Sequence, residues 1–311
     1  MIFRDMPDVP PRPATTSNAP FRRWLYSRWG KEHAIIGASL RHAEIGAWSQ
    51  PLSIKAVWGG SSEHRIDNRR VCVDDDSYVV LNEDRSYGST WRSDRADRDM
   101  SALCIFLKRG MPAEVFGAMS TSLALAADEG ADLPRRPLAF CERLRPHDIS
   151  VTPLLKDLHE AVRRGESDET WFAERYQELL EAVITTEHLL QQRAETIRSV
   201  KPSTRIELMR RVNWATDYIL SNYADTISLD DIASAASLSK FHLVRLFRQV
   251  HNTTPHAFLQ RKRAQVARRM IEITDLDLND VAANVGFGSR WTMFRQLRRS
   301  FGVSGLALRA R

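Results

Sequence analysis

Residues 229–255 read LDDIASAASLSKFHLVRLFRQVHNTTP, and residues 278–305 read LNDVAANVGFGSRWTMFRQLRRSFGVSG. Both segments begin Leu-x-Asp-aliphatic-Ala, break after one short helix, restart on a serine and continue as a basic helix. The two restarting serines, Ser239 and Ser289, lie 50 residues apart. This repetition predicts two helix-turn-helix units in the last third of the chain.

Small residues and turn residues support this interpretation. Ala233 and Ala282 stand where the first helix of each unit must cross closely over the second. Gly286 suits the tight turn of the second copy because glycine tolerates a positive φ, whereas Ser237 stands at the equivalent place in the first copy. The predicted buried stripes are Leu243, Leu246, Phe247 and Val250 in the first copy, and Leu297 and Phe301 with Met293 or Phe294 in the second.

In the second helix of each copy, the face opposite the buried stripe carries the candidate DNA-binding residues. Arginine can bond a guanine edge in two places, and threonine or valine can touch a thymine methyl group. The candidates are Lys240, Phe241, Val244, Arg245 and Arg248 in the first copy, and Arg290, Trp291, Thr292, Arg295 and Arg299 in the second. Candidates for phosphate contacts are Arg261, Lys262, Arg268, Arg269, Arg298 and Arg299.

Residues that favour a helix start predict where the helices of this region begin. A long predicted helix, residues 255–273, separates the copies and spans roughly 27 Å at 1.5 Å per residue. That length suits two recognition helices in successive major grooves, which repeat every ~34 Å along the duplex. The start signals are Ser228 for 229–236, Ser239 for 240–251, Pro255 for 255–273, Asp277 for 278–284, Ser289 for 290–301, and Ser304 for a final turn.

The charge distribution agrees with a nucleic-acid partner. The net charge of +6 is modest, but residues 201–311 hold 18 Lys and Arg against 9 Asp and Glu, a net charge of +9. Residues 1–200 therefore carry a net charge of −3. The positive excess belongs to the last third alone, which favours DNA binding by that domain.

The tandem pattern resembles the DNA-binding domain of the AraC/XylS transcription regulators, over residues 205–309. The resemblance is carried by LSKFHLVRLF, the helix start at Pro255–Phe258, the Arg263–Ala267 spacing and Val285-Gly286-Phe287-Gly288. It implies base reading by Phe241, Val244 and Arg245, and by Arg290, Trp291, Thr292 and Arg295. It also implies a structural ion pair for Arg263, with Asp231 or Asp280. The sequence departs from the family pattern at Ser237, Asn252, Gly305 and Met293-Phe294.

Residues 21–150 predict a strand-rich domain. Short apolar segments alternate with turns in SIKAVWGG, HRIDNRRVCV, DDDSYVVLNED and SALCIFLKRG, which is typical of a sandwich or barrel. This region resembles, more weakly, the cupin-like sensor domain of such regulators, so the fold class is α+β. His33, His42 and His64 are too dispersed for a metal site. A small-molecule pocket could use Trp48, Trp58, Tyr78 or Trp91, although core packing explains each of them too.

Residues 151–200 predict an antiparallel helix pair with one apolar stripe. The stripe would pack either against the domain's own sheet or against a second copy of the chain. Residues 201–204, KPST, suit a linker before the DNA-binding domain at 205–311. The first 20 residues suit a disordered arm, because proline and charges interrupt any signal sequence.

The composition narrows the function class. No apolar run reaches the ~20 residues that a membrane span needs. Cys72, Cys104 and Cys141 are isolated, so they support neither a disulfide framework nor a zinc site. We expect a homodimeric, cytoplasmic transcription regulator of double-stranded DNA, an activator that contacts RNA polymerase, without cofactor or metal and with room for a small-molecule effector. A DNA-anchored enzyme and a ligand-independent architectural DNA-binding protein stay open as alternatives.

Overall fold

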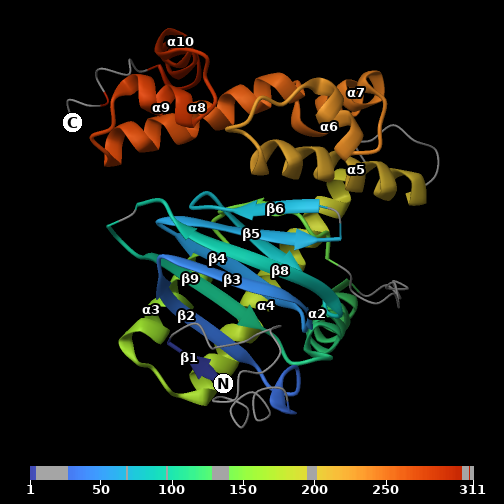
Figure 1. Ribbon diagram of the computed structural model, residues 1–311. Helices are drawn as coiled ribbons and strands as arrows, with labels where there is room; N and C mark the ends of the chain where they lie inside the picture. Colours follow the sequence, from blue (N-terminus) through green and yellow to red (C-terminus); the bar gives the residue numbers. More distant parts are fainter. Residues whose placement is uncertain are drawn as a thin grey trace. The chain divides into compact units, whose positions relative to one another are not determined.

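The computed structural model describes residues 1–4, 27–67, 69–95, 97–127, 140–194, 202–302 and 308. The chain divides into two compact units, Met1–Leu190 and Gln191–Arg311. The first unit combines strands with helices, and the described part of the second is helical, which confirms the α+β class (Figure 1). None of the described helices has both the length and the apolar character that a membrane span requires.

Two sheets pack face to face in the first unit. Both sheets are mainly antiparallel. The larger has the order β1 (Ile2–Phe3), β2 (Ala34–Leu40), β9 (Met100–Phe106), β4 (Ser53–Trp58), β7 (Ser77–Leu81) and β10 (Leu144–Pro146). The smaller has the order β3 (His42–Gln50), β8 (Arg85–Ser93), β5 (Gly60–Ile66) and β6 (Arg69–Val73).

Burial along the strands shows which faces are covered. In β5 and β8, buried residues alternate with more exposed ones, as expected for a sheet with one face toward solvent. In β4, Ile54 and Ala56 belong to the core shared with the helices, whereas Ser53 and Lys55 are buried on the other face. The larger sheet is therefore buried on both faces.

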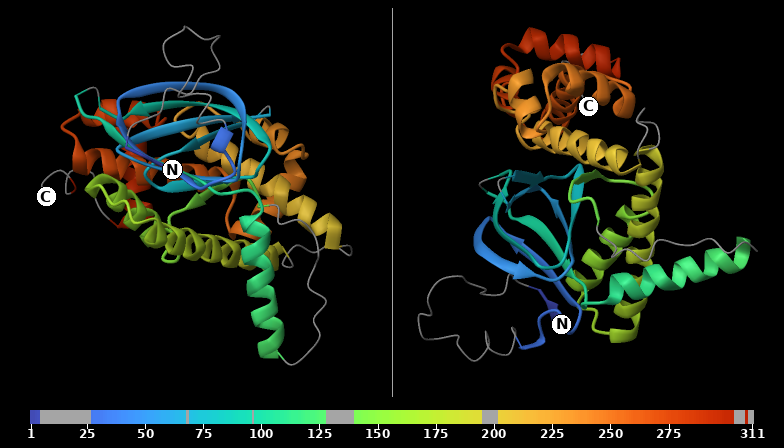
Figure 2. Two further views of the ribbon diagram at one scale, coloured as in Figure 1. Left: turned by 90° about the horizontal axis from the view of Figure 1, so that it is seen from below. Right: turned by 90° about the vertical axis from the view of Figure 1, so that its right-hand side faces the viewer.

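Helices α3 (Thr152–Arg164) and α4 (Glu169–Ala194) cover the outer face of the larger sheet (Figure 2). Their apolar stripe is buried in one core with Ile35, Ile54 and Leu103 of that sheet. Of the two expectations for this stripe, packing against the chain's own sheet is confirmed, and a dimer interface on these helices stays a prediction. The stripe residues are Leu155, Leu158, Val162, Phe172, Tyr176, Leu179, Leu180, Val183 and Ile184.

Two further features of the first unit differ from expectation, and a third fits one of two alternatives. Helix α2 (Met111–Ala127) was not predicted, because glycine, serine, threonine and alanine blur its apolar period. Residues 1–4 are not a disordered arm, since β1 pairs in parallel with β2, and residues 5–20 lie outside the described part. Trp58 and Tyr78 pack on the helix side of the larger sheet, which fits the core-packing alternative, and they do not line the cavity between the two sheets.

The second unit contains α5 (Pro202–Ser221), α6 (Leu229–Ala235), α7 (Lys240–His251), α8 (Pro255–Ile273), α9 (Leu278–Asn284) and α10 (Arg290–Phe301). The expected linker at 201–204 is wrong from Pro202 onward, because proline is compatible with the first turn of a helix and Pro202 begins α5. One core joins α5, α6, α7 and the start of α8, and a second joins the rest of α8 with α9 and α10. The final turn expected at Ser304 lies outside the described residues.

Candidate DNA-binding surface

The two helix-turn-helix units make the same turn with different residues. In the first, the Leu238 amide donates to the Ala233 carbonyl at 2.9 Å, and in the second, the Phe287 amide donates to the Ala282 carbonyl at 2.8 Å. Both turns need a left-handed residue, with φ of 51° at Ser237 and 81° at Gly286. Serine pays about 1–2 kcal/mol for this conformation, which glycine adopts freely.

A second group supports the strained turn. The Arg211 guanidinium of α5 donates to the Ser237 carbonyl at 2.6 Å and pairs with Glu207 one turn earlier on the same helix. Asn252 is a second departure at which the family pattern has glycine; it takes a left-handed C-cap position with φ of 53°, and its amide donates to the Arg248 carbonyl. Both substitutions for glycine therefore leave the predicted geometry in place.

Capping serines define where each second helix begins. The Ser239 hydroxyl accepts the His242 amide, and the Ser289 hydroxyl accepts the Thr292 amide, each at 3.3 Å. These bonds satisfy amides that have no partner within the helix. Because α7 and α10 start at equivalent serines, their residues correspond one to one at an offset of 50.

The outward faces of α7 and α10 carry the predicted DNA-binding residues. Phe241 is 78% exposed and Trp291 is 71% exposed, although large aromatic side chains are normally buried. These two residues occupy the same position in their helices. Lys240, Arg245, Arg248, Arg290, Arg295 and Arg299 are also exposed, while Val244 and Thr292 are partly buried.

Most cations on these faces are not neutralised by the protein. Lys240 pairs with Asp230 at 2.8 Å. Within the described part of the chain, Arg245, Arg248 and Arg295 form no ion pair, and the Arg290 guanidinium lies over the Trp291 ring, 5.5 Å from its centroid. A surface of exposed arginines beside exposed aromatic rings suits binding to phosphates and base edges.

The residues expected to contact phosphates differ in how accessible their side chains are. Lys262 is only 6% exposed and its ammonium lies over the Tyr223 ring, so it is part of the domain interior. Arg268 pairs with Glu272 at 2.8 Å and lies over the Phe301 ring, which leaves it less available to a ligand. Arg261, Arg298 and Arg299 are exposed.

Arg263 has a different structural role from the expected ion pair. Its Nε and Nη2 donate to the carbonyls of Tyr223 and Asp225, at 2.7 and 2.8 Å. A Cβ on Gly286 would approach Arg263 Nη2 to 2.9 Å. Arg263 therefore joins the loop before the first helix-turn-helix unit to the turn of the second. Burial lowers the pKa of its guanidinium, and nearby Asp225 opposes this.

The one-to-one correspondence also reveals one residue that sequence reasoning missed, His242, and one that it assigned only to phosphate contacts, Arg298. His242 is exposed at the position of Thr292, and Arg298 corresponds to Arg248. Arg299 corresponds instead to the partly buried Gln249. Aligning the copies on their serines would have identified both equivalences.

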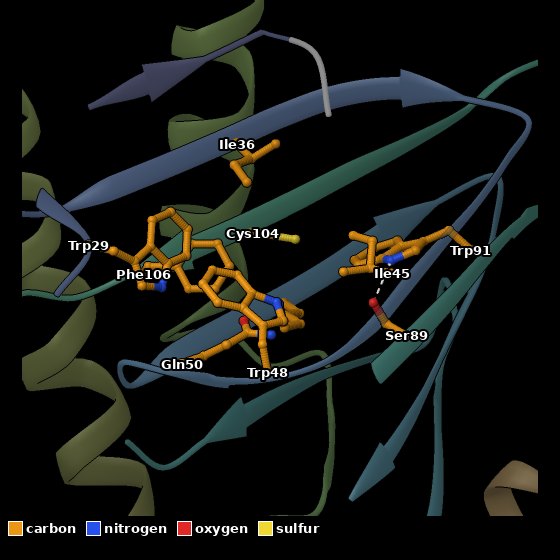
Figure 3. A pocket seen from close by; sticks show the side chains of 10 residues that line it. Trp29, Ile36, Ile45, Trp48, Gln50, Ser89, Trp91, Cys104 and Phe106 are labelled. Atoms are coloured by element: carbon orange, nitrogen blue, oxygen red, sulfur yellow. Dashed lines mark hydrogen bonds between the residues drawn. The ribbon is translucent and has the colours of Figure 1, made fainter. Parts of the chain in front are cut away.

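The first unit holds a small cavity between its two sheets, and no group of metal-binding side chains is found among the residues that the structure describes. Two of the aromatic residues named as pocket candidates, Trp48 and Trp91, do line this cavity (Figure 3).

Residues 232–311 match the family model described as "Helix-turn-helix domain". The chain is 29% identical over 87 residues to the HTH-type transcriptional activator AarP of Providencia stuartii, which is 28% of this chain and 64% of that protein. It is 33% identical over 124 residues to the transcriptional activator NphR of Rhodococcus sp, which is 40% of this chain and 34% of that protein. These matches span less than two thirds of either relative.

Among solved structures, the DNA-binding domain of AdpA in complex with a target DNA is similar, with 26% identity and a TM-score of 0.31. The alignment covers 32% of this chain and 89% of that one.

Proposed function

We propose that the protein is a transcription regulator that binds a specific DNA sequence through a C-terminal domain of the AraC type, because residues 232–311 match the helix-turn-helix family model. The observation that carries the proposal is the pair of equivalent helix faces on α7 and α10. Each presents an exposed aromatic ring and an arginine that none of the described acidic residues neutralises.

The proposed contacts follow from the chemistry of these side chains. Arg245 and Arg295 would each bond the O6 and N7 atoms of a guanine, and Val244 and Thr292 would touch thymine methyl groups. Phe241 and Trp291 supply flat apolar surfaces beside them. Helix α8, with 19 residues, would separate the two reading helices by about one turn of the duplex.

The proposal is tested by selecting binding sites from random DNA and measuring affinity by fluorescence anisotropy. Arg245→Ala and Arg295→Ala should each lose about 1–3 kcal/mol of binding free energy and relax the base preference at one position. Arg164→Ala is the matched control, because Arg164 is an exposed arginine on α3 of the other unit. Wild-type affinity and specificity in both recognition-helix variants would contradict the assignment.

Salt dependence gives a second measurement. Six phosphate contacts would reduce the affinity by on the order of 1,000-fold between 50 and 200 mM salt. A salt-independent affinity would argue against a DNA-binding surface of this kind.

The wider role extends the proposal. We infer that the protein is an activator, as the name of its relative AarP suggests, and that it contacts RNA polymerase while bound to DNA in the cytoplasm. We also propose a homodimer, whose interface would have to avoid the buried stripe of α3 and α4. Sedimentation of the full-length chain tests this, and a monomer at all concentrations would rule it out.

We further propose that the first unit senses a small molecule and does not catalyse a reaction. A DNA-anchored enzyme of the alkyl-transfer type needs an activated cysteine. Cys104 is buried, and burial raises the pKa of its thiol, which disfavours the reactive thiolate.

A further inference from the structure

A buried lysine occupies the centre of the first unit. Lys55 lies in the middle of β4, which is itself inside the larger sheet, and its side chain faces the smaller sheet. It is 3% exposed. Lysine is almost never fully buried unless a partner compensates its charge, because removing an ammonium from water costs several kcal/mol.

The surroundings of Lys55 compensate this charge only in part. Its Nζ lies 4.5 Å from the centroid of the Phe106 ring and 5.3 Å from that of Tyr87. Such contacts are worth about 2 kcal/mol when desolvated, which is less than the cost of burial. None of the described carboxylates forms an ion pair with Lys55.

The titratable neighbours supply no negative charge. Burial raises the pKa of the Tyr87 hydroxyl and of the Cys104 thiol, and it lowers the pKa of His64, so all three are neutral at pH 7. Burial acts to lower the pKa of Lys55 as well, but interactions with Cys104 and Tyr87, including side-chain hydrogen bonds to both, raise it above its ordinary value. The side chain is therefore a cation without an acidic counter-ion among the residues that the structure describes.

Lys55 also lines the cavity between the two sheets, together with Trp29, Trp48, Trp91 and Phe106. Figure 3 shows the rings of Trp29, Trp48 and Phe106 on one side of Cys104 and Trp91 on the other. The cavity offers about 20 Å³ to the centre of a water molecule, which is room for one or two waters. Four flat aromatic rings therefore line the cavity beside one positive charge, and aliphatic and small polar side chains complete its walls.

Polar groups in the cavity point to a hydrogen-bond acceptor as the missing partner. The Trp29 indole N–H is buried and has no hydrogen-bond partner among the described residues. The Gln50 Oε1 already accepts from the Tyr87 hydroxyl at 2.7 Å, so its amide nitrogen is the remaining polar end of that side chain. The cavity thus presents hydrogen-bond donors and a cation.

We propose that this cavity binds a small, flat monocarboxylic acid, with its carboxylate on Lys55 and its ring among the tryptophans. The inference rests on the proposed sensing function and gives it a ligand class. One cation favours a single negative charge, and the aromatic walls favour a planar apolar body. Because a ring needs more space than one or two waters, the half-buried Trp29 side chain must move when the ligand enters.

The test uses the full-length chain with benzoate as the probe and benzamide as its neutral counterpart. Benzoate should raise the melting temperature and change the tryptophan fluorescence, while benzamide should do neither. Lys55→Met, which removes the charge but keeps an unbranched chain, should weaken benzoate binding by at least about tenfold. Lys156→Met, at an exposed lysine of α3, should bind benzoate like wild type.

Two outcomes overturn the inference. The first is an absence of benzoate binding to wild type, and the second is equal binding of benzoate and benzamide to wild type. Both are measured on the wild-type chain, so neither depends on whether a variant folds. DNA binding is measured on the same samples. A chain that binds its selected DNA but not benzoate contradicts only the ligand class, whereas loss of specific DNA binding in wild type contradicts the proposed function.

Discussion

At the scale of single residues, Ser237 and Gly286 show how the same turn can be made at different cost. Replacing Ser237 with glycine removes the left-handed strain of about 1–2 kcal/mol. It also costs about 0.5–1 kcal/mol, because a glycine backbone loses more conformational entropy on folding than a serine backbone does. Ser237→Gly should therefore stabilise the second unit by about 0.5–1 kcal/mol. Urea unfolding measures this. Asn252→Gly is the control and should change less, because asparagine tolerates a positive φ.

The reverse substitution should be far more damaging. A Cβ at position 286 would lie 2.6 Å from the Ala224 carbonyl oxygen and would also retain a positive φ. Gly286→Ala should therefore cost about 2–4 kcal/mol of unfolding free energy. Urea unfolding measures this loss, and Gly288→Ala is the control, because a Cβ at position 288 meets nothing within 4 Å. The difference between the two variants isolates the effect of the close approach at position 286. Equal losses in the two variants would show that the close approach is unimportant.

Residues with unusual roles were the hardest to predict. The exposure of Phe241 and Trp291 followed from their helix faces, because the buried stripe was clear. Lys262 and Arg263 look like any other basic residues of a DNA-binding domain, and only the structure places them in its interior. Lys55 gave no signal either, since a lysine in a short strand is normally assigned to the solvent face.

At the scale of elements, the helices of the second unit were predictable because their ends are encoded locally. Ser228, Ser239 and Ser289 each cap the helix they were expected to cap, and Asn252 and Gly302 end α7 and α10 in left-handed conformations. The strands were predictable as a set but not in their order. Pairing of β9 between β2 and β4 depends on contacts between distant residues, which no local pattern specifies.

Helix α8 sets the relation between the two helix-turn-helix units through Arg263. Arg263→Lys keeps the charge but cannot reproduce both bonds of the guanidinium, to Tyr223 and Asp225. We expect a loss of about 1–3 kcal/mol in unfolding free energy. DNA affinity should fall more on a site with both half-sites than on one with a single half-site. The exposed Arg261→Lys is the control, and equal stability of the two variants would refute the role.

At the scale of the whole molecule, the two units should respond differently to acid. His33, His64, His147 and His159 all have a lowered pKa, in each case mainly through burial, and all lie in the first unit. A histidine whose pKa is lower in the folded state than in the unfolded state binds a proton more readily when the chain is unfolded. Protonation near and below pH 6.5 therefore favours unfolding. The stability of the first unit should therefore fall as the pH falls.

His33 is the best single test of this behaviour. Burial, Lys108 and the N-terminal amine lower its pKa from 6.5 to about 4, so its contribution is complete above pH 6.5 and is lost progressively toward pH 4. Between pH 7 and 5, wild type should lose about 1 kcal/mol more than His33→Gln, allowing for partial exposure. Urea unfolding at the two pH values measures this, with the exposed His42→Gln as control. Identical losses would show that His33 is not responsible.

The unlike recognition faces also give the molecule a direction. Positions 245 and 295 are both arginine, but Phe241 corresponds to Trp291 in the alignment of the two copies, and His242 corresponds to Thr292. Under the proposed function, the two half-sites would therefore be related without being interchangeable. A bound molecule would lie one way round on its site, and inverting that site would turn the protein around. Transcription leaves a promoter on one side only, so this polarity would decide which neighbouring gene the bound protein can serve.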